Sequence, residues 1–342
     1  MQVPPGNPEK RTMTQTALVA SATDFVKQKA ASVSLQDVVR ALGMPVLGII
    51  AFLLLWQLAA QNIQTSLGTL PGPAEVAHQA GNLWVDYREE QERAAEFIAM
   101  QKERNAEILA NNPDAEVRIR PYSGGVTFVD QILTSLGTVL SGFMLASLIA
   151  VPLGIVVGLN RYLYQAANPV IQVFKPVSPL AWLPIVTLVV SATYTADDPM
   201  FSKSFITSMI TVSLCSLWPT LVNTIMGVNS VSQDLRNVSQ VLRLPFLTHV
   251  WKVVLPSSIP MIFTGMRLSL GIAWMVLIAA EMLAQSPGLG KFVWDEFQNG
   301  SSESLGRIMV AVIVIGVIGL LLDRGMLTLQ RLLSWDKSSA TH

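Results

Sequence analysis

The segment ILTSLGTVLSGFMLASLIAVPLGIVVGL, residues Ile132–Leu159, decides the fold, because its 28 residues include no charged side chain. The hydrocarbon core of a bilayer is about 30 Å thick, and a helix needs about 20 mostly apolar residues to cross it. The segment is therefore predicted to span a membrane. The whole chain agrees, since 51% of its 342 residues are hydrophobic and only 13% are charged, about half the charged fraction of a typical soluble domain.

Five further apolar runs raise the number of predicted spans to six. The spans are Met44–Ala60, Ile132–Leu159, Val170–Tyr194, Phe205–Val228, Ile259–Gln285 and Ile308–Leu333. The predicted fold is an all-α integral membrane protein with a cytoplasmic N-terminal segment (1–43), a first span (44–60), an outer segment (61–131), a five-helix core (132–333) that includes a loop at 229–258, and a cytoplasmic tail (334–342).

The distribution of lysine and arginine predicts that both termini are cytoplasmic. Cytoplasmic segments retain positive charge. With the N-terminus inside, twelve Lys and Arg residues fall in cytoplasmic segments, whereas the two short outer loops hold only Lys203, Lys291 and Arg307. The stretch Thr16–Gly43 is amphipathic, and we expect it to form an elbow helix on the inner membrane face.

The outer segment contains a highly charged stretch, Val85–Asn111, which ends at Asn-Asn-Pro. Pairs such as Arg88 with Glu92 and Glu89 with Arg93 have the i, i+4 spacing that stabilises a helix. A helix outside the membrane is therefore predicted here. Two roles remain open for it: a solvated spacer, or a surface that contacts an extracytoplasmic partner.

Several classes of function find no support in the sequence. The pair Gly290-Lys291 is followed by Phe292, so it does not complete a phosphate-binding loop. Formal net charge is zero, which gives no reason to expect nucleic acid, and the single cysteine, Cys215, excludes an intramolecular disulfide. We therefore expect no metal, no catalytic residues and no cofactor bound by this chain. The histidines, which show no metal-binding spacing, are His78, His249 and His342.

The loop between the fourth and fifth spans has a definite order. Residues 228–260 read VNSVSQDLRNVSQVLRLPFLTHVWKVVLPSSIP. A polar, helix-compatible piece precedes a break at Pro245, and a second short helix then leads through Leu255-Pro256 into the next span. Two short helices below a bundle form a rigid knob that can seat in a groove of a partner.

This loop resembles the EAA signature of bacterial ABC import permeases, which reads Glu-Ala-Ala, a Gly four residues later, and then apolar-x-Leu-Pro. The chain keeps Val253-Val254-Leu255-Pro256 but has Asn-Val-Ser at 237–239 and Arg243 at the glycine position. The resemblance implies docking of an ATPase subunit. The coupling residues that it implies are Asn237, Val238, Ser239, Arg243, Leu244, Pro245, Leu255 and Pro256.

Other stretches resemble the permease of the nitrate, bicarbonate and sulfonate branch of these importers, nearest to its nitrate members. They are NPVIQVFKPVSPLAWLP (168–184), WPTLVNT (218–224), FTGMRLSLGIAW (263–274), AAEML (279–283) and VWDE (293–296). The resemblance covers about Ile132–Leu333. It implies a non-catalytic, multi-pass subunit of the inner membrane. Two copies would assemble with two cytoplasmic ATPases, which bind ATP and Mg, and with a periplasmic solute-binding protein. Bicarbonate, cyanate and organic sulfonates remain alternatives to nitrate or nitrite.

Ionisable groups within spans are hypotheses for function. Lys175 lies beside prolines that would break or loosen the third span, and it either contacts the anion or extends to the inner interface. Arg267 either attracts the anion or anchors its helix, for example by meeting Glu281 or the neighbouring loop. Glu281 would repel an anion, so we expect it to be a hydrogen-bonded structural carboxylate.

Polar and aromatic side chains in the spans complete the candidate path. Hydroxyl and amide groups there either bind the anion or join helices, and the tryptophans are either packing residues or part of the path. The candidate path residues are Lys175, Trp182, Thr220, Asn223, Thr264 and Arg267. An ion-coupled secondary transporter is the alternative from another class, but the sequence lacks the repeated broken spans and midplane acids that it would need.

Overall fold

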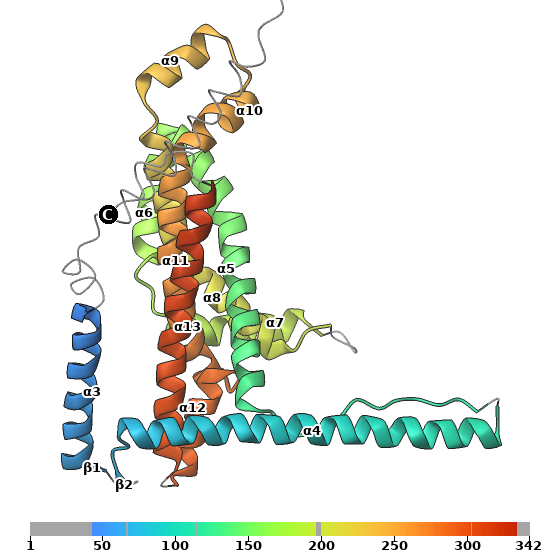
Figure 1. The fold of residues 1–342 in the computed structure, drawn as a ribbon. Coiled ribbons are helices and arrows are strands. Elements are labelled where there is room, and N and C mark those ends of the chain that lie inside the picture. Colours follow the sequence, from blue (N-terminus) through green and yellow to red (C-terminus); the bar gives the residue numbers. More distant parts are fainter. Residues whose placement is uncertain (1–42, 66–67, 114, 196–199, 302, 334–342) are drawn as a thin grey trace, which may run out of the picture. The chain divides into compact units, whose positions relative to one another are not determined.

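The computed structural model describes residues 43–65, 68–113, 115–195, 200–301 and 303–333. The chain divides into two compact units, Met1–Pro73 and Ala74–His342. The predicted elbow before Gly43 and the tail at 334–342 lie outside the described residues. The elements (Figure 1) are α3 (Met44–Asn62), β1 (Gln64–Thr65), β2 (Gly68–Thr69), α4 (Pro73–Asn111), α5 (Phe128–Leu159), α6 (Arg161–Phe174), α7 (Pro179–Thr193), α8 (Lys203–Asn229), α9 (Gln233–Val241), α10 (Phe246–His249), the π-helical turn η2 (Val250–Val254), α11 (Leu255–Ala284), α12 (Leu289–Asn299) and α13 (Ser304–Leu333).

The first unit contains α3 and a two-stranded hairpin that the sequence did not predict. In α3 the apolar residues surround the whole helix rather than one face, and only Ala60 is buried. A helix that is apolar all round is suited to a lipid environment. The hairpin pairs Gln64 with Thr69 and Thr65 with Gly68, and the indole Nε1 of Trp56 donates to the carbonyl of Pro71 at 3.1 Å.

The second unit is a helical bundle in which α8 packs along both α5 and α11. Small residues permit this close approach. A Cβ added to Gly142 or Gly154 of α5 would lie 2.8 Å or 2.7 Å from side-chain atoms of α8, and one added to Gly265 of α11 would lie 2.9 Å from the carbonyl oxygen of Pro219 in α8. Packing through small residues is the usual way for membrane helices to associate, because lipid supplies no hydrophobic drive between them.

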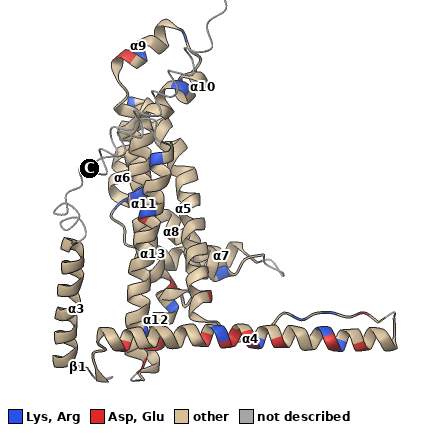
Figure 2. Cartoon of the chain, in the orientation of Figure 1, with Lys and Arg blue, Asp and Glu red and all other residues tan. Residues whose placement is uncertain are grey.

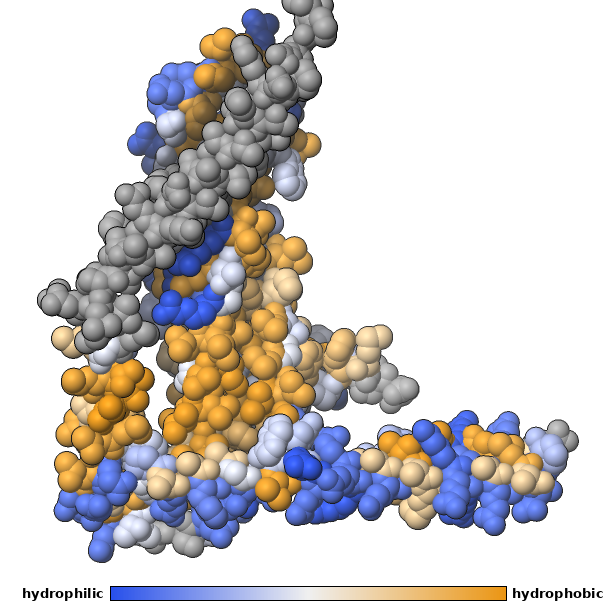
Figure 3. Space-filling view, viewed as in Figure 1, coloured by the Kyte–Doolittle hydropathy of each residue, from blue (hydrophilic) through white to orange (hydrophobic). Residues whose placement is uncertain are grey.

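The buried face of α8 is rich in hydroxyl groups, and backbone carbonyls accept their hydrogen bonds. The hydroxyl of Thr211 donates to the carbonyl of Thr207 at 2.8 Å, and that of Thr224 donates to Thr220 at 2.7 Å. Such bonds satisfy a polar group within its own helix, which matters where water is excluded. Figure 3 shows the complementary outer surface, with apolar residues over the bundle and hydrophilic residues over much of α4.

The described residues include five helices long and apolar enough to cross a membrane, or six if one bent pair is counted as a span. This confirms the helical membrane fold. The third predicted span, Val170–Tyr194, is broken where its prolines were expected to break or loosen it: α6 and α7 meet at 99°. Pro176 and Pro179 explain the bend, because proline lacks the backbone donor and disfavours helix at the preceding residue.

The outer helix is longer than the sequence predicted. Helix α4 begins at Pro73 rather than Val85 and contains 39 residues. Its first part carries few charges, but Val76, Gln79 and Leu83 are buried. Packing on the bundle, rather than the charge pattern, therefore defines this part of the helix.

Candidate coupling and transport site

Helices α9 and α10 form a knob, residues 233–254, at the opposite end of the bundle from α4 (Figure 1). Figure 2 shows charged residues concentrated on α4 and at the knob, with few along the bundle between them. The orientation inferred from lysine and arginine places the knob in the cytoplasm.

A tight turn after α9 sets the angle between the two knob helices. The N–H of Arg243 donates to the carbonyl of Gln240 at 3.0 Å, and the N–H of Leu244 donates to Ser239 at 3.1 Å. This is the hydrogen-bond pattern of a Schellman motif, whose C′ residue is left-handed and usually glycine. Arg243 occupies that position with φ of 49°. The backbone shape expected of the signature's glycine is therefore kept although the residue is arginine.

Two polar contacts fix the knob internally and to α8. The hydroxyl of Ser239, a buried residue, lies 2.7 Å from Nδ1 of His249 and so joins α9 to α10. The Nη2 of Arg236 donates to the carbonyls of Val228 and Asn229 at 3.0 Å and 3.4 Å. These carbonyls end α8, where a cation is favourable. The knob is thereby tied to the end of α8.

The outer surface of the knob includes several large apolar side chains. Leu242 is 63% exposed and Leu247 is 69% exposed, and Val241, Phe246 and Trp251 are exposed beside them in the sequence. A cavity of about 430 Å³ lies underneath. A group of large apolar side chains exposed on a part of the protein that lies outside the membrane is typical of an interaction surface.

The sequence suggested that the second knob helix is separate from the span that follows, but the two are continuous. The backbone continues from Phe246 to Ala284 as one helical segment of 39 residues, with a π-helical turn at Val250–Val254. The ring of Pro256 would collide with a carbonyl one turn earlier in a regular α-helix, and the wider π turn accommodates it.

The predicted coupling residues differ in their accessibility. Val238 and Arg243 are exposed, whereas Ser239 is buried. The amide oxygen of Asn237 accepts a hydrogen bond from Gln233 at 3.0 Å. Leu244 and Pro245 form the turn between the helices, and Leu255 and Pro256 begin α11.

Lys175 lies at the junction between α6 and α7, where it is exposed. Phe174 stacks on Trp182 with ring centroids 5.9 Å apart and on Trp218 of α8 at 6.2 Å. Helix α7 starts at Pro179, four residues after Lys175, with Ser178 as its N-cap. The positive end of a helix dipole and an ammonium group therefore lie close together along the chain, an arrangement that favours an anion.

Thr220 and Asn223 lie where α8 meets α11. The hydroxyl of Thr220 is 2.7 Å from that of Ser269, and its backbone N–H donates to the same oxygen at 3.0 Å. The side chain of Asn223 donates to the carbonyl of Pro219 at 2.8 Å. Thr264 is exposed and donates to the carbonyl of Pro260. In this chain the hydroxyl of Thr220 serves a helix–helix contact.

Arg267 forms a bidentate ion pair with Asp323 of α13. Its Nη2 lies 2.9 Å from Oδ1 and 3.2 Å from Oδ2, and its Nε lies 3.1 Å from Oδ1. The sequence offered Glu281 as a partner, and this was wrong, because Glu281 lies 14 residues further along α11, about 21 Å away at 1.5 Å per residue.

Loss of Asp323 is expected to destabilise the protein more than loss of both partners. Asp323→Leu leaves a guanidinium without its counter-ion and should cost about 2 kcal/mol or more, whereas Arg267→Met with Asp323→Leu should recover most of this. Thermal unfolding of the purified variants in one detergent measures the coupling. If the double variant unfolded at the same temperature as Asp323→Leu, the ion pair would not be the cause.

Glu281 is the centre of a hydrogen-bonded cluster at the other end of α11. It is 1% exposed, and its carboxylate accepts from the hydroxyl of Ser135 at 2.8 Å and 2.9 Å and from the N–H of Gly290 at 2.9 Å. The hydroxyl of Ser135 in turn accepts from the N–H of Leu289 at 2.9 Å. One carboxylate thus links α5, α11 and the start of α12.

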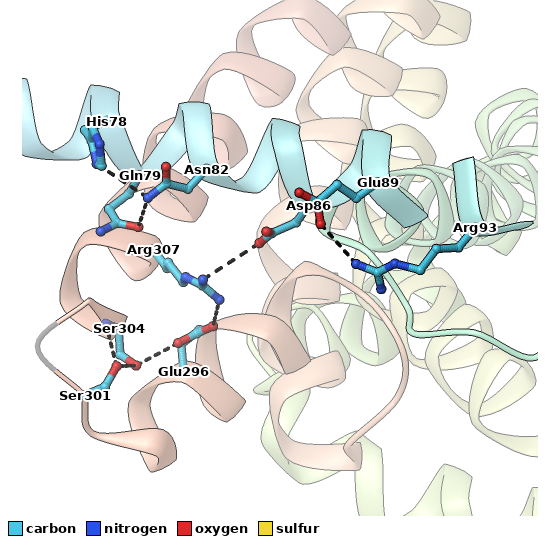
Figure 4. Close-up of polar contacts among 10 residues, drawn as sticks. All are labelled: His78, Gln79, Asn82, Asp86, Glu89, Arg93, Glu296, Ser301, Ser304 and Arg307. Atoms are coloured by element: carbon cyan, nitrogen blue, oxygen red, sulfur yellow. Dashed lines mark hydrogen bonds and ion pairs between the residues drawn. The ribbon is translucent and has the colours of Figure 1, made fainter. Parts of the chain in front are cut away.

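An ionic contact joins α4 to this end of the bundle (Figure 4). The guanidinium of Arg307 lies 3.8 Å from Asp86 of α4 and 3.4 Å from Glu296 of α12. Glu296 also accepts from the hydroxyl of Ser304 at 2.7 Å. Gly306 allows α4 to approach α13 closely, because an added Cβ would lie 2.7 Å from Cγ of Gln79.

Sequence reasoning missed the partners of the charged residues. The sequence alone did not connect Asp323, Ser135, Gly290 or His249 to their partners. Only Asp323 gave a signal that could have been used, since an acid late in a span calls for a cation at similar depth.

Comparison with known proteins is informative over most of the chain. Residues 150–334 match the model of a family described as binding-protein-dependent transport system inner membrane component. A nitrate import permease protein of Synechocystis sp. is 38% identical over 202 residues, which are 59% of this chain and 68% of that protein. A bicarbonate transport system permease protein of Synechocystis sp. is 34% identical over 293 residues, covering 85% of this chain and 88% of that protein.

The fold also matches solved structures. One chain of an inward-facing MetNI methionine ABC transporter superposes with a TM-score of 0.52 and 12% identity, covering 60% of this chain and 95% of that chain. At this identity the likeness shows the fold alone.

Proposed function

The chain belongs to the family of binding-protein-dependent transport system inner membrane components, and from that premise we propose that it conducts nitrate across the inner membrane. It is a non-catalytic importer subunit of the nitrate and bicarbonate type. In the proposed assembly, a second copy of the permease, two cytoplasmic ATPases that bind ATP and Mg, and an outer solute-binding protein complete the transporter.

The knob is the observation that carries the proposed coupling to ATP hydrolysis. It is held to α8 by Arg236 and continues without interruption into α11, so a movement of the knob is passed to both helices. Its exposed apolar residues, among them Leu242 and Leu247, are suited to a groove on an ATPase subunit. Ligand and nucleotide would then shift the population between two states of the bundle.

The bend between α6 and α7 supports an anion as the substrate. Lys175 ends α6, and the N-terminus of α7 follows after Ser178. Broken helices whose positive ends meet an anionic group are a recurrent way of building transport sites. Nitrate is favoured by the higher identity to the nitrate permease, and bicarbonate is the second candidate, because the bicarbonate permease matches over more of the chain.

Reconstitution tests the proposal. The permease, its ATPases and the solute-binding protein are placed in proteoliposomes, and ATP-dependent uptake of isotopically labelled nitrate is measured with bicarbonate as competitor. Uptake of nitrate that bicarbonate does not displace is expected. Uptake of bicarbonate alone would replace nitrate as the substrate. Uptake by the permease without ATP or ATPases, driven by an ion gradient, would instead make it a secondary transporter.

Lys175→Ala is expected to lower uptake about tenfold when the anion concentration is below saturation. The reason is the loss of one favourable charge contact, whose free energy of about 1.4 kcal/mol corresponds to a factor of ten. Lys175→Arg keeps the charge and should retain most of the uptake. Initial rates across a range of anion concentrations separate an effect on affinity from one on turnover. Unchanged kinetics in Lys175→Ala would assign the side chain to the membrane interface instead.

A further inference from the structure

The far part of α4 and the segment that follows it have no role in the proposed transport cycle. We call residues 91–111 of α4 together with residues 115–126 the arm. Helix α4 contacts α13 through Gln79 and Asp86, and Glu90 accepts the N–H of Gly125 at 2.7 Å. Beyond Glu90 the helix continues for 21 residues, about 31 Å. The arm therefore extends well past its last contact with the bundle (Figure 1).

The level of the arm relative to the membrane follows from helix lengths. Helices α5 and α13 contain 32 and 30 residues, which is about 45–48 Å and slightly more than the thickness of about 40–45 Å of a bilayer with its headgroups. Helix α4 contacts Gly306 in the first turn of α13 and Gly125 just before α5. It therefore crosses the bundle at the level of the outer headgroups.

One face of α4 points toward the membrane along its whole length. The residues that contact the bundle include Gln79, Leu83 and Glu90. At 100° per residue, Phe97, Gln101, Arg104 and Ile108 lie within about 40° of the same direction. The arm thus presents to the bilayer the face that α4 presents to the bundle.

The returning segment is hydrogen-bonded along this membrane-facing side. Gln101 Nε2 donates to the carbonyl of Arg120 at 3.0 Å, and the N–H of Arg120 donates to Gln101 Oε1 at 2.8 Å. Asn105 Nδ2 donates to the carbonyl of Arg118 at 3.4 Å. Nearer the bundle, the ring of Tyr122 packs at a tilt against that of Phe97, with centroids 5.4 Å apart, and its hydroxyl donates to Glu90. Arg118 and Arg120 are thereby fixed beside α4.

Most charges of the arm are separated by face, the exception being Lys102, which lies about 120° from the membrane-facing direction. Arg104, Arg118 and Arg120 line a groove of about 440 Å³ with Phe97 and Ile108, and none of the three arginines forms an ion pair with any described residue. The return segment carries one acid, Glu116. The arm's helical glutamates all lie about 90° or more from the membrane-facing direction; they are Glu92, Glu96, Glu103 and Glu107.

We propose that the arm lies on the outer leaflet of the membrane and that Arg104, Arg118 and Arg120 bind the phosphates of anionic phospholipids. Guanidinium groups pair with phosphate through two parallel hydrogen bonds. Ile119, which is exposed between the two return-segment arginines, contacts the boundary with the acyl chains. Interfacial elements combine these features: basic and apolar residues toward the lipid, acids toward water. A soluble partner would meet the acidic face instead.

Spectroscopy on the whole assembly tests the proposal. In a Cys215→Ser background, a fluorophore is attached at Ile119→Cys or, as a matched control, at Ala99→Cys on the opposite face. The permease and its ATPases are placed in nanodiscs of anionic phospholipid, some carrying a nitroxide headgroup. Quenching is expected to be about threefold stronger at residue 119 than at residue 99 and to weaken at high salt. Arg104→Gln with Arg118→Gln and Arg120→Gln should remove most of the difference.

Three results would overturn the proposal. Equal quenching at the two positions would place the arm away from the lipid. Quenching that is the same in zwitterionic bilayers and insensitive to the three substitutions would show that the arginines do not bind lipid phosphate. Shielding of residue 119 that appears only when the solute-binding protein is added would assign the groove to that protein.

Discussion

Replacing Leu242 or Leu247 by aspartate is expected to weaken binding of the ATPase subunits by about 30-fold, because a central apolar contact of an interface is worth about 2 kcal/mol. Both side chains are largely exposed in the isolated chain, so neither change removes contacts from the permease itself. ATP-driven uptake should fall in parallel. Co-purification of the ATPases and uptake in proteoliposomes measure the two effects.

The control for this prediction adds the same charge directly before the knob. Ser232 is the N-cap of α9, a position where aspartate is well tolerated. Ser232→Asp should therefore leave assembly and uptake close to those of the parent protein. Full uptake by Leu242→Asp and Leu247→Asp would show that the apolar surface of the knob does not dock the ATPase.

Gly290→Ala is expected to destabilise the permease by about 3 kcal/mol, the upper end of the range for overpacking a core. An added Cβ would collide with the carbonyl oxygen of Ile278, a backbone atom that cannot move aside alone. Separating α12 from α11 would also lengthen the hydrogen bond from the N–H of Gly290 to Glu281. A buried carboxylate that loses a donor is costly.

Gly271 of α11 provides the matched control. No atom lies within 4 Å of a Cβ added to Gly271, so Gly271→Ala should be neutral or slightly stabilising, since alanine favours helix. Thermal unfolding in detergent and the yield of inserted protein compare the two variants. Similar midpoints for Gly290→Ala and Gly271→Ala would mean that the contact between α11 and α12 can relax.

The spans could be predicted because hydropathy reports directly on the length of chain that lipid must cover. Proline residues likewise marked the junction between α6 and α7. The partner of Arg267 could not be predicted, since pairing with Asp323 depends on how α11 and α13 are rotated against each other. The start of α4 was missed for a related reason: its first turns are defined by contact with the bundle, not by a local charge pattern.

In the candidate site, too, some features could be predicted from the sequence and others could not. The knob was recognisable because its order of helix, turn and helix is local, although the π-helical turn was not foreseen. The path residues were chosen because they are polar and lie within the spans. Polarity does not distinguish a residue that lines a path from one that joins two helices, so their roles could not be predicted. The hydroxyl of Thr220 meets Ser269, whereas Lys175 stays exposed at a junction, and its role in the path stays a prediction.

The uninterrupted segment from Phe246 to Ala284 is about 58 Å long at 1.5 Å per residue. Gly265, where the backbones of α8 and α11 touch, is 19 residues from each end. The segment thus has the form of a lever with a central fulcrum. We therefore expect that a push on the knob end swings the end that carries Glu281 by a similar distance in the opposite direction, so that one rod can open one entrance while it closes the other.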